Sequence, residues 1–131
     1  MAKKNFSSET EKKQALGKLI AQCRGNISQR QLAKMIDLPP SNLTYIENGV
    51  NVPSPEVYLK IMQTLNPKPK IRQKMDKLYM EIRKLPPPDV CNVLMKNTEM
   101  VDKLRILSET SLTQGQLQRV EELFNSFKGE V

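Results

Sequence analysis

The sequence contains no histidine and no tryptophan, and aromatic residues make up only 5% of its 131 positions. Histidine is the commonest general base and metal ligand near neutral pH, so its absence disfavours hydrolases and metalloenzymes. The chain also lacks a phosphate-binding glycine loop and a set of carboxylates at catalytic spacing. We therefore expect no enzymatic activity, no metal site and no cofactor.

Cysteine is scarce as well, because Cys23 and Cys91 are the only two in the chain. Metal sites need clustered ligands, and these two residues are far apart in the sequence. Each lies within an apolar pattern of helical spacing. We predict two reduced thiols in the core rather than a disulfide or a metal-binding pair.

Long apolar runs are absent, so no segment is expected to span a bilayer. The N-terminal stretch MAKKNFSSETEKK is polar and has no apolar segment of the kind that a signal peptide requires. These two observations predict a protein that does not associate with membranes and resides in the cytoplasm.

β-branched runs with two-residue alternation are also missing, whereas apolar residues recur at spacings of three and four. This periodicity predicts an all-α fold. Three capping boxes mark helix starts, at Ser8-x-x-Glu11, Ser28-x-x-Gln31 and Thr113-x-x-Gln116. A fourth start is marked by Ser54-Pro55-Glu56, with serine as the cap and proline at the first helical position.

The pattern predicts helices over about Glu9–Arg24, Gln29–Ile36, Pro40–Glu47 and Pro55–Leu65. A fifth helix carries a heptad-like apolar stripe made of Ile71, Met75, Leu78, Ile82 and Leu85. Later helices are predicted over about Asp89–Lys96, Glu99–Leu107 and Gln114–Lys128. Because the prolines of residues 66–70 oppose regular helix, we predict a domain of residues 1–66 and a separate helical region of residues 67–131.

The net charge of +7 is unevenly distributed along the chain. Residues 1–70 carry 11 lysines and arginines against 5 acidic residues, whereas residues 71–131 carry 10 against 9. An excess of +6 in the first half is expected of a domain that meets a polyanion. The alternative is a basic surface that merely keeps the protein in solution.

One segment carries a long series of spaced motif positions, namely Ser28-Gln29, Leu32-Ala33, Leu38, Leu43, Ile46-Glu47, Gly49 and Pro53-Ser54. With this spacing the chain resembles the XRE-like family of phage repressors and Cro proteins over about residues 8–65. The resemblance implies a lambda-repressor-like helix-turn-helix domain, followed here by an additional helical C-terminal region. It also implies a sequence-specific, DNA-binding transcriptional regulator, most simply a dimeric repressor.

The burial pattern explains how such a helix pair would meet double-stranded DNA. The first helix would bury Leu32, Ala33 and Ile36, and the second would bury Leu43 and Ile46. Two short helices at a steep angle leave the solvent face of the second free to enter the major groove. That face carries short hydrogen-bonding groups and one aromatic ring, suited to base edges or a thymine methyl, on Ser41, Asn42, Thr44 and Tyr45.

The predicted DNA contacts are Gln29, Pro40, Ser41, Asn42, Thr44, Tyr45 and Asn48. The resemblance implies that Gln29 holds the start of its helix on a phosphate, and Asn48 is similarly suited to a backbone contact. It also implies that Glu47 is structural and pairs with a residue of the first helix. The apolar register of that helix selects Arg24, whereas counting back from Gln29 selects Gln22, and we favour Arg24.

Three residues at the turn depart from the family pattern. Asp37 replaces the usual glycine, and Pro39 and Pro40 replace the polar residues that normally cap and open the second helix. The end of the helix that reads DNA therefore offers fewer polar groups than usual. These departures suggest an alternative function, a protein-interaction adaptor of the antitoxin or antirepressor kind that binds DNA weakly.

Dimerisation has two candidate surfaces in the sequence. One is the stripe of the fifth helix, unless that helix packs within the monomer; the other is the last helix, with Leu117, Val120, Leu123, Phe124 and Phe127. A protein or peptide partner for the C-terminal helices is the alternative to a homodimer.

The seven methionines could line a ligand groove, although core filling is the simpler role. Lys3 and Lys4 form either a basic arm or an ordinary solvated terminus.

Overall fold

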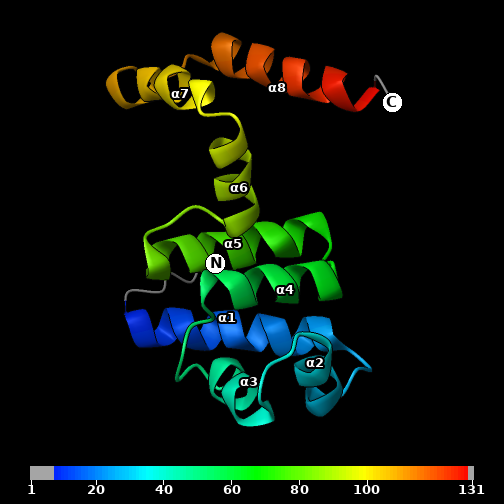
Figure 1. The fold of residues 1–131 in the computed structure, drawn as a ribbon. Helices are drawn as coiled ribbons and strands as arrows, with labels where there is room; N and C mark the ends of the chain where they lie inside the picture. The colour runs from blue at the N-terminus through cyan, green and yellow to red at the C-terminus, as the bar shows by residue number, and fades with distance from the viewer. Residues whose placement is uncertain (1–7, 130–131) are drawn as a thin grey trace, which may run out of the picture. The chain divides into compact units, whose positions relative to one another are not determined.

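The computed structural model describes residues 8–129, and over this range the chain forms eight helices and no strand (Figure 1). The helices are α1 (Glu9–Arg24), α2 (Gln29–Met35), α3 (Pro40–Glu47), α4 (Pro55–Leu65), α5 (Pro69–Arg83), α6 (Pro88–Lys96), α7 (Glu99–Glu109) and α8 (Gln114–Gly129). The predicted all-α fold is therefore confirmed.

Side-chain caps begin four of these helices, as the sequence predicts. Ser28 and Gln31 form both hydrogen bonds of a capping box at the start of α2, and Thr113 and Gln116 do so at the start of α8. The Ser54 hydroxyl accepts a hydrogen bond from the N–H of Val57, at 3.2 Å, and so caps α4. At α1, Ser8 likewise accepts from the N–H of Glu11, although its own hydroxyl donates to the Glu11 carboxylate.

The two ends of α5 differ from the sequence prediction. Pro69 is the first helical residue, although residues 66–70 were expected to be non-helical, because proline fits the first position of a helix without losing a hydrogen bond. The helix ends at Arg83, since Lys84 adopts a left-handed conformation with φ of 58°. Leu85 therefore lies outside the helix and is 45% exposed, so the predicted apolar stripe is one residue too long.

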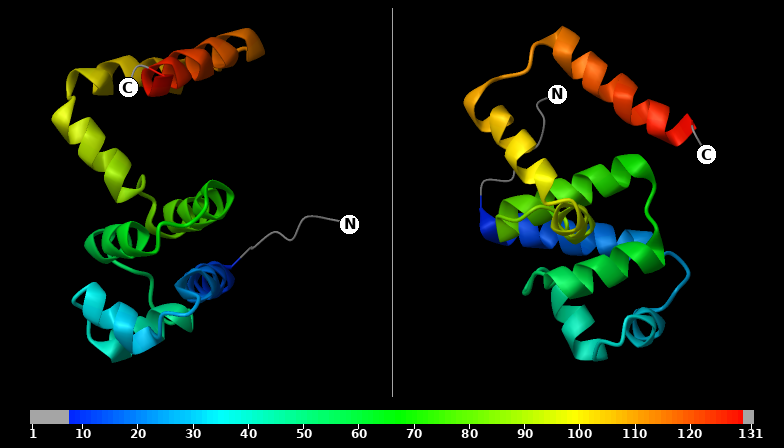
Figure 2. Two further views of the ribbon diagram at one scale, coloured as in Figure 1. Left: turned by 90° about the vertical axis from the view of Figure 1, so that its right-hand side faces the viewer. Right: turned by 45° about the horizontal axis from the view of Figure 1, so that its top comes forward.

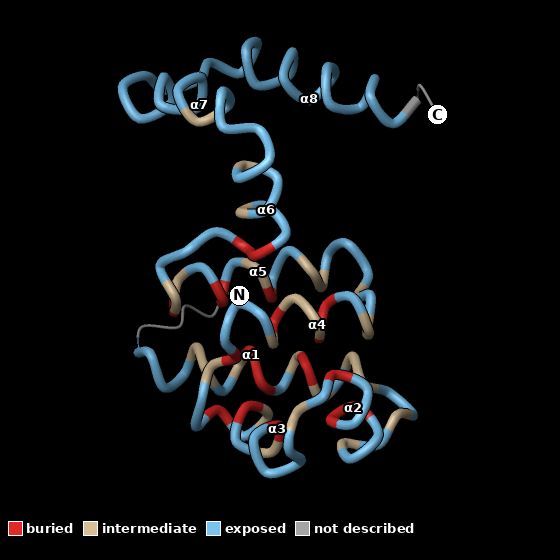
Figure 3. Tube along the Cα trace, viewed as in Figure 1, coloured by how far each residue is buried: buried red, intermediate tan, exposed pale blue. Residues whose placement is uncertain are grey.

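The core is built around α1. In Figure 1, α2 and α3 lie on one side of α1 and α4 and α5 on the other, and α1 contacts all four. Figure 3 shows that the buried residues concentrate between these helices. The buried apolar side chains are Leu16, Ile20, Leu32, Ala33, Ile36, Leu43, Ile46, Tyr58, Ile61, Met62, Met75, Leu78, Tyr79 and Ile82.

Helix α5 is an integral part of this core. Met75 and Tyr79 are fully buried, and Tyr79 stacks on Tyr58 of α4 with ring centroids 4.2 Å apart. The Tyr58 hydroxyl donates to Asp76 at 2.7 Å. The guanidinium of Arg83 donates to two backbone carbonyl oxygens of the loop between α3 and α4, those of Val52 and Pro53. The apolar stripe of α5 is thus used within the chain, and it is not a free surface for a second copy.

The chain divides into two compact units, of which the first ends at Asn92 and the second begins at Val93. The first unit therefore extends past residue 66, where the sequence places a domain boundary, because α5 completes the core. The second unit contains the end of α6, all of α7 and α8, which Figure 2 draws in yellow to red. None of the residues of α7 is buried.

Both cysteines are free thiols. Cys23 packs against the core, with its sulfur 4.0 Å from that of Met75, and burial raises the pKa of its thiol. Cys91 is half-buried rather than in the core.

Residues 8–129 contain no group of three cysteine, aspartate or glutamate side chains that could hold a metal ion. No helix in that range is both long enough and apolar enough to cross a membrane.

Candidate functional site

The site is built on α2, which begins at the capping box of Ser28. This box satisfies two of the backbone groups at the helix start, and it fixes where the helix begins. Leu32 and Ala33 are fully buried against the core. Because Ala33 is small, it takes little room where α2 meets its neighbours. The opposite face of α2, which includes Arg30 and Lys34, is exposed to solvent.

The turn between α2 and α3 forms without the usual glycine. Asp37 adopts a left-handed conformation with φ of 54°. This conformation costs an L-residue free energy, although aspartate and asparagine tolerate it better than most others do. The backbone N–H of Leu38 then donates to the carbonyl oxygen of Ala33 at 2.8 Å and closes the turn. The turn therefore forms with aspartate at the position where the family pattern has glycine.

Helix α3 begins with two prolines. Pro39 is the cap residue and makes no side-chain hydrogen bond, as the sequence predicts, while Pro40 occupies the first helical position. Leu43 and Ile46 are buried and hold the inner face of α3 on the core. The start of α3 is therefore fixed by proline geometry rather than by a polar cap.

The outer face of α3 is open to solvent. Pro40, Ser41, Asn42 and Asn48 are exposed, and Tyr45 keeps 50% of its surface accessible. Five of the seven residues predicted to contact DNA are thus exposed, in α3 or directly after it. The other two, Gln29 and Thr44, are half-buried and hydrogen-bond to each other.

An ion pair ties α1 to the end of α3. Arg24 donates through Nε and Nη2 to the two carboxylate oxygens of Glu47, at 2.9 and 3.0 Å. The Glu47 side chain is only 5% exposed, and Arg24 also donates to the carbonyl oxygen of Ile27. The structure therefore confirms Arg24, rather than Gln22, as the partner of Glu47.

This ion pair extends into a network that crosses from α2 to α3. The side-chain amide of Gln29 donates to the Glu47 carboxylate at 3.0 Å, and its oxygen accepts from the Thr44 hydroxyl at 2.7 Å. The amide of Gln29 is thus held from both ends. It keeps one N–H, besides the backbone N–H at the start of α2, with which to contact another molecule.

The sequence did not reveal the network around Gln29. Gln29 and Thr44 are 15 residues apart, and they meet only because the turn at Asp37 brings α3 across the start of α2. Arg30 was also overlooked, although it is exposed and lies in the first turn of α2 beside Gln29. Because Arg30 directly follows a glutamine that is expected to bind phosphate, the sequence already indicated it as a candidate phosphate contact. Lys3 and Lys4, considered as a basic arm, lie outside the described residues.

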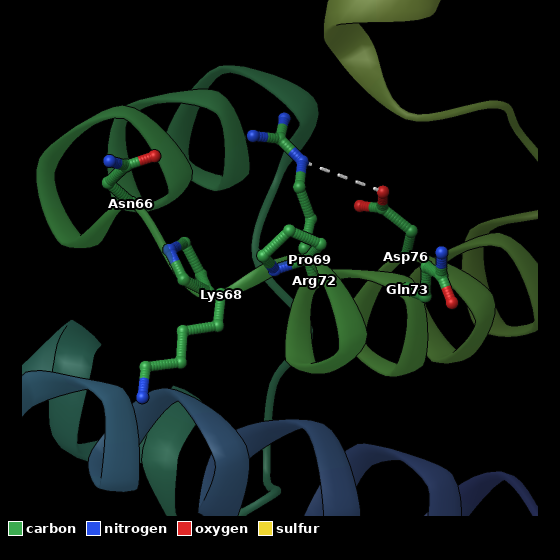
Figure 4. A pocket seen from close by; sticks show the side chains of 7 residues that line it. Asn66, Lys68, Pro69, Arg72, Gln73 and Asp76 are labelled. Carbon is green, nitrogen blue, oxygen red and sulfur yellow. Dashed lines mark ion pairs between the residues drawn. The ribbon is translucent and has the colours of Figure 1, made fainter.

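A separate hollow lies where α4 meets α5 (Figure 4), lined by Asn66, Pro67, Lys68, Pro69, Arg72, Gln73 and Asp76. Arg72 forms ion pairs with Asp76 at 3.8 Å and with Asp89 at 3.0 Å, so its charge is already compensated. None of the methionines lines this hollow, and Met62 and Met75 fill the core instead. The candidate site is therefore the surface of α2 and α3.

Residues 20–69 match a family model described as helix-turn-helix. The match begins within α1 and ends at the first residue of α5, so it includes the whole of α2, the turn and α3. Comparisons with curated proteins and with solved structures gave no match.

Proposed function

Because residues 20–69 match a helix-turn-helix family model, we propose that this protein is a DNA-binding regulator of the XRE-like, phage-repressor type. We propose further that it is a sequence-specific repressor in which α3 reads bases in the major groove. The observation that carries the proposal is the division of α3 between two faces. Leu43 and Ile46 anchor one face in the core, whereas the other presents exposed polar and aromatic side chains.

Base recognition is assigned to the exposed face of α3. The side-chain amide of Asn42 has the donor and acceptor needed for the edge of an adenine. Ser41 offers a hydroxyl near the start of the helix, where recognition helices contact base edges. Tyr45 offers an aromatic edge for a thymine methyl and a hydroxyl for a base or a phosphate. Pro40 contributes contact area rather than hydrogen bonds.

Phosphate contacts are assigned to the residues that flank α3. Gln29 lies at the N-terminus of α2, where free backbone N–H groups and the helix dipole favour an anion. Its remaining amide N–H and the exposed guanidinium of Arg30 are available for the same phosphate. Asn48, just past the end of α3, would contact the backbone on the other side. Thr44 serves mainly to hold Gln29 in position.

The charge distribution supports this assignment. The described part of the first unit, residues 8–92, carries 14 lysines and arginines against 8 acidic residues, a net charge of +6. Cations of this kind attract DNA through its phosphates and release the ions condensed on it. We also propose that the protein acts as a homodimer, because paired recognition helices can engage two half-sites about one helical turn apart.

A second candidate function rests on the prolines at the start of α3. Because Pro39 and Pro40 replace polar residues at the end that normally reads DNA, affinity for base edges could be low. In that case the same surface would serve an adaptor that binds a protein partner. The two candidates differ in one measurable property, which is whether the protein prefers one DNA sequence over others.

The test is selection of bound duplexes from a random pool, followed by titration of the enriched sequence. If the protein is a sequence-specific repressor, the selected duplexes should share a defined consensus sequence. Replacing Asn42 by alanine should then weaken binding by about 1–3 kcal/mol and relax the preference at one base pair. Gln63→Ala is the matched control, because Gln63 is an exposed amide on α4, across α1 from α3. A pool that yields no enriched sequence would favour the adaptor.

A further inference from the structure

Four lysines lie along the outer face of α5, and we refer to them as the lysine row. Lys70, Lys74 and Lys77 are spaced four and three residues apart, and Lys84 follows directly after the helix. The opposite face of α5 packs in the core, so all four lysines are exposed to solvent. Because α5 lies across α1 from α2 and α3, the lysine row is on the other side of the first unit from the surface assigned to base reading (Figure 1).

The positive charge of the first unit is concentrated around α5. Residues 68–84 carry seven lysines and arginines against two acidic residues, a net charge of +5 out of the +6 of residues 8–92. By contrast, residues 29–47, from the start of α2 to the end of α3, carry two cationic and two acidic side chains and are neutral. The charge that attracts a polyanion to this unit therefore lies mainly on α5.

The acidic residues of α5 do not compensate the lysine row. Helix α5 has only two of them, and each pairs with another cation at 3.8 Å, Asp76 with Arg72 and Glu81 with Lys12. Within residues 8–129, no lysine of the row forms an ion pair. Like charges three and four residues apart destabilise a helix slightly, so the row does not serve the stability of α5. Its charges remain available to another molecule.

The lysine row has the length and the sign that the backbone of duplex DNA requires. Lys70 and Lys84 are 14 residues apart, so the row is about 20 Å long at a rise of about 1.5 Å per residue. One DNA strand carries a phosphate about every 3.4 Å along the duplex axis, which places about six phosphates along that length. Lysine binds a phosphate as a point charge on a flexible stem, without a fixed geometry. The row is therefore suited to phosphates rather than to base edges.

Other partners fit this face less well. Protein interfaces are depleted of lysine and depend on aromatic and apolar anchors, whereas Met80 is the one large apolar residue of α5 that is exposed. A helix that binds a membrane surface inserts its apolar face, but the apolar face of α5 is occupied by the core. Duplex DNA is also the ligand that the helix-turn-helix match indicates for this chain.

We propose that the lysine row of α5 is a second DNA-binding surface, which holds the phosphate backbone of a duplex segment other than the one that α3 reads. The inference rests on the proposed function in one respect, namely that duplex DNA is the ligand. It does not depend on base recognition, because contacts to phosphates carry no sequence information. The protein then contacts DNA on two opposite sides of its first unit.

The experiment titrates the full chain into a labelled duplex of random sequence, by fluorescence anisotropy at NaCl concentrations from about 50 to 200 mM. The test variant combines three alanine substitutions in the lysine row, K70A, K74A and K77A. We expect weaker binding and a slope of log K against log salt that is shallower by about 0.9 for each lost lysine. The matched control removes the same charge from the second unit, through alanine at three exposed lysines, Lys96, Lys103 and Lys128. It should leave the slope unchanged.

A second variant with arginine at the same three positions of the row keeps the charge, and it should bind like the wild type. Circular dichroism checks that all variants keep their helices. A slope in the alanine variant equal to that of the wild type would overturn the proposal, and so would an equal loss in the control or in the arginine variant.

Failure of base reading is detected separately, by selection from the random pool. The alanine variant of the row should select the same consensus as the wild type, because its α3 is unchanged. A wild type that selects no consensus would contradict base reading by α3, whereas the salt slopes would still test the lysine row.

Discussion

At the scale of single residues, α1 approaches the end of α3 closely at Gly17. A β-carbon added there would overlap with the backbone carbonyl oxygens of Ile46 and Glu47, the latter at 2.5 Å. Because these are backbone atoms of α3, they cannot turn away as a side chain would. Gly17 therefore sets the distance between α1 and the end of the helix assigned to base reading.

We predict that Gly17→Ala destabilises the protein by about 2 kcal/mol or more, because α3 must move away from α1. The measurement is urea unfolding followed by circular dichroism. Gly115→Ala is the matched control, since Gly115 lies in α8 and a β-carbon there meets nothing within 4 Å. That control should be neutral or slightly stabilising. Equal stability of Gly17→Ala and the wild type would contradict the close approach.

The Arg24–Glu47 pair gives a second prediction at this scale. Arg24→Ala leaves the Glu47 carboxylate, 5% exposed, without its cation, so we expect a loss of about 3 kcal/mol. In the double variant with Glu47→Ala the loss should be smaller than the sum of the two single losses, because no buried charge remains unpaired. Lys60→Ala breaks the ion pair between Lys60 and Glu56, whose side chains are 40% and 80% exposed. This change should lower the free energy of unfolding by no more than about 0.5 kcal/mol. Additive losses from Arg24→Ala and Glu47→Ala would show that the two residues do not interact.

At the scale of elements, the sequence predicts the helix boundaries well because caps are local. Ser28 and Ser54 each act on a backbone N–H three residues away, so their effect can be read without knowing the fold. Arg24 was identified by the register of one helix against a known pattern. The link from Gln29 to Thr44 was not predicted, because it depends on the angle between α2 and α3.

The position of α5 shows the limit of sequence patterns most clearly. An apolar stripe fits equally well against a helix of the same chain and against a second copy, so Met75 and Ile82 do not reveal which occurs. The prolines of residues 66–70 were interpreted as a domain boundary, yet α5 begins at Pro69 and returns to the core. Only the tertiary contacts of α5, such as that between Tyr58 and Asp76, distinguish the alternatives.

The packing of α5 on α4 predicts a loss of stability at alkaline pH. Burial raises the pKa of Tyr58, and its hydrogen bond to Asp76 raises it further; burial also raises the pKa of Tyr79. In the unfolded chain both hydroxyls ionise near pH 10, whereas in the folded protein their raised pKa values oppose ionisation. The free energy of unfolding should therefore fall above about pH 10, by up to ~1.4 kcal/mol per pH unit for each tyrosine.

Urea unfolding at pH values from about 8 to 11 measures this dependence. Because lysine and cysteine side chains also titrate in this range, the decisive comparison is with Tyr58→Phe. That variant removes one of the two buried hydroxyls, so its stability should fall less steeply with pH than that of the wild type. Identical slopes would mean that Tyr58 does not remain protonated in the folded state.

At the scale of the whole molecule, two compact units differ in charge and in surface. Residues 8–92 carry the net charge of +6 and the exposed face of α3, whereas residues 93–129 are neutral and expose apolar side chains. The proposed DNA-binding surface accordingly lies in the basic first unit.

The central claim is that α3 reads base sequence, and fluorescence anisotropy across a salt series tests it most directly. The protein is titrated into labelled DNA from upstream of its own gene and into a scrambled duplex of equal length. We predict binding to the native sequence at least ~1,000-fold tighter than to the scrambled one, with that preference lost in Tyr45→Ala. Equal and steeply salt-dependent binding to both duplexes would contradict the claim, because attraction to phosphates alone would then explain it.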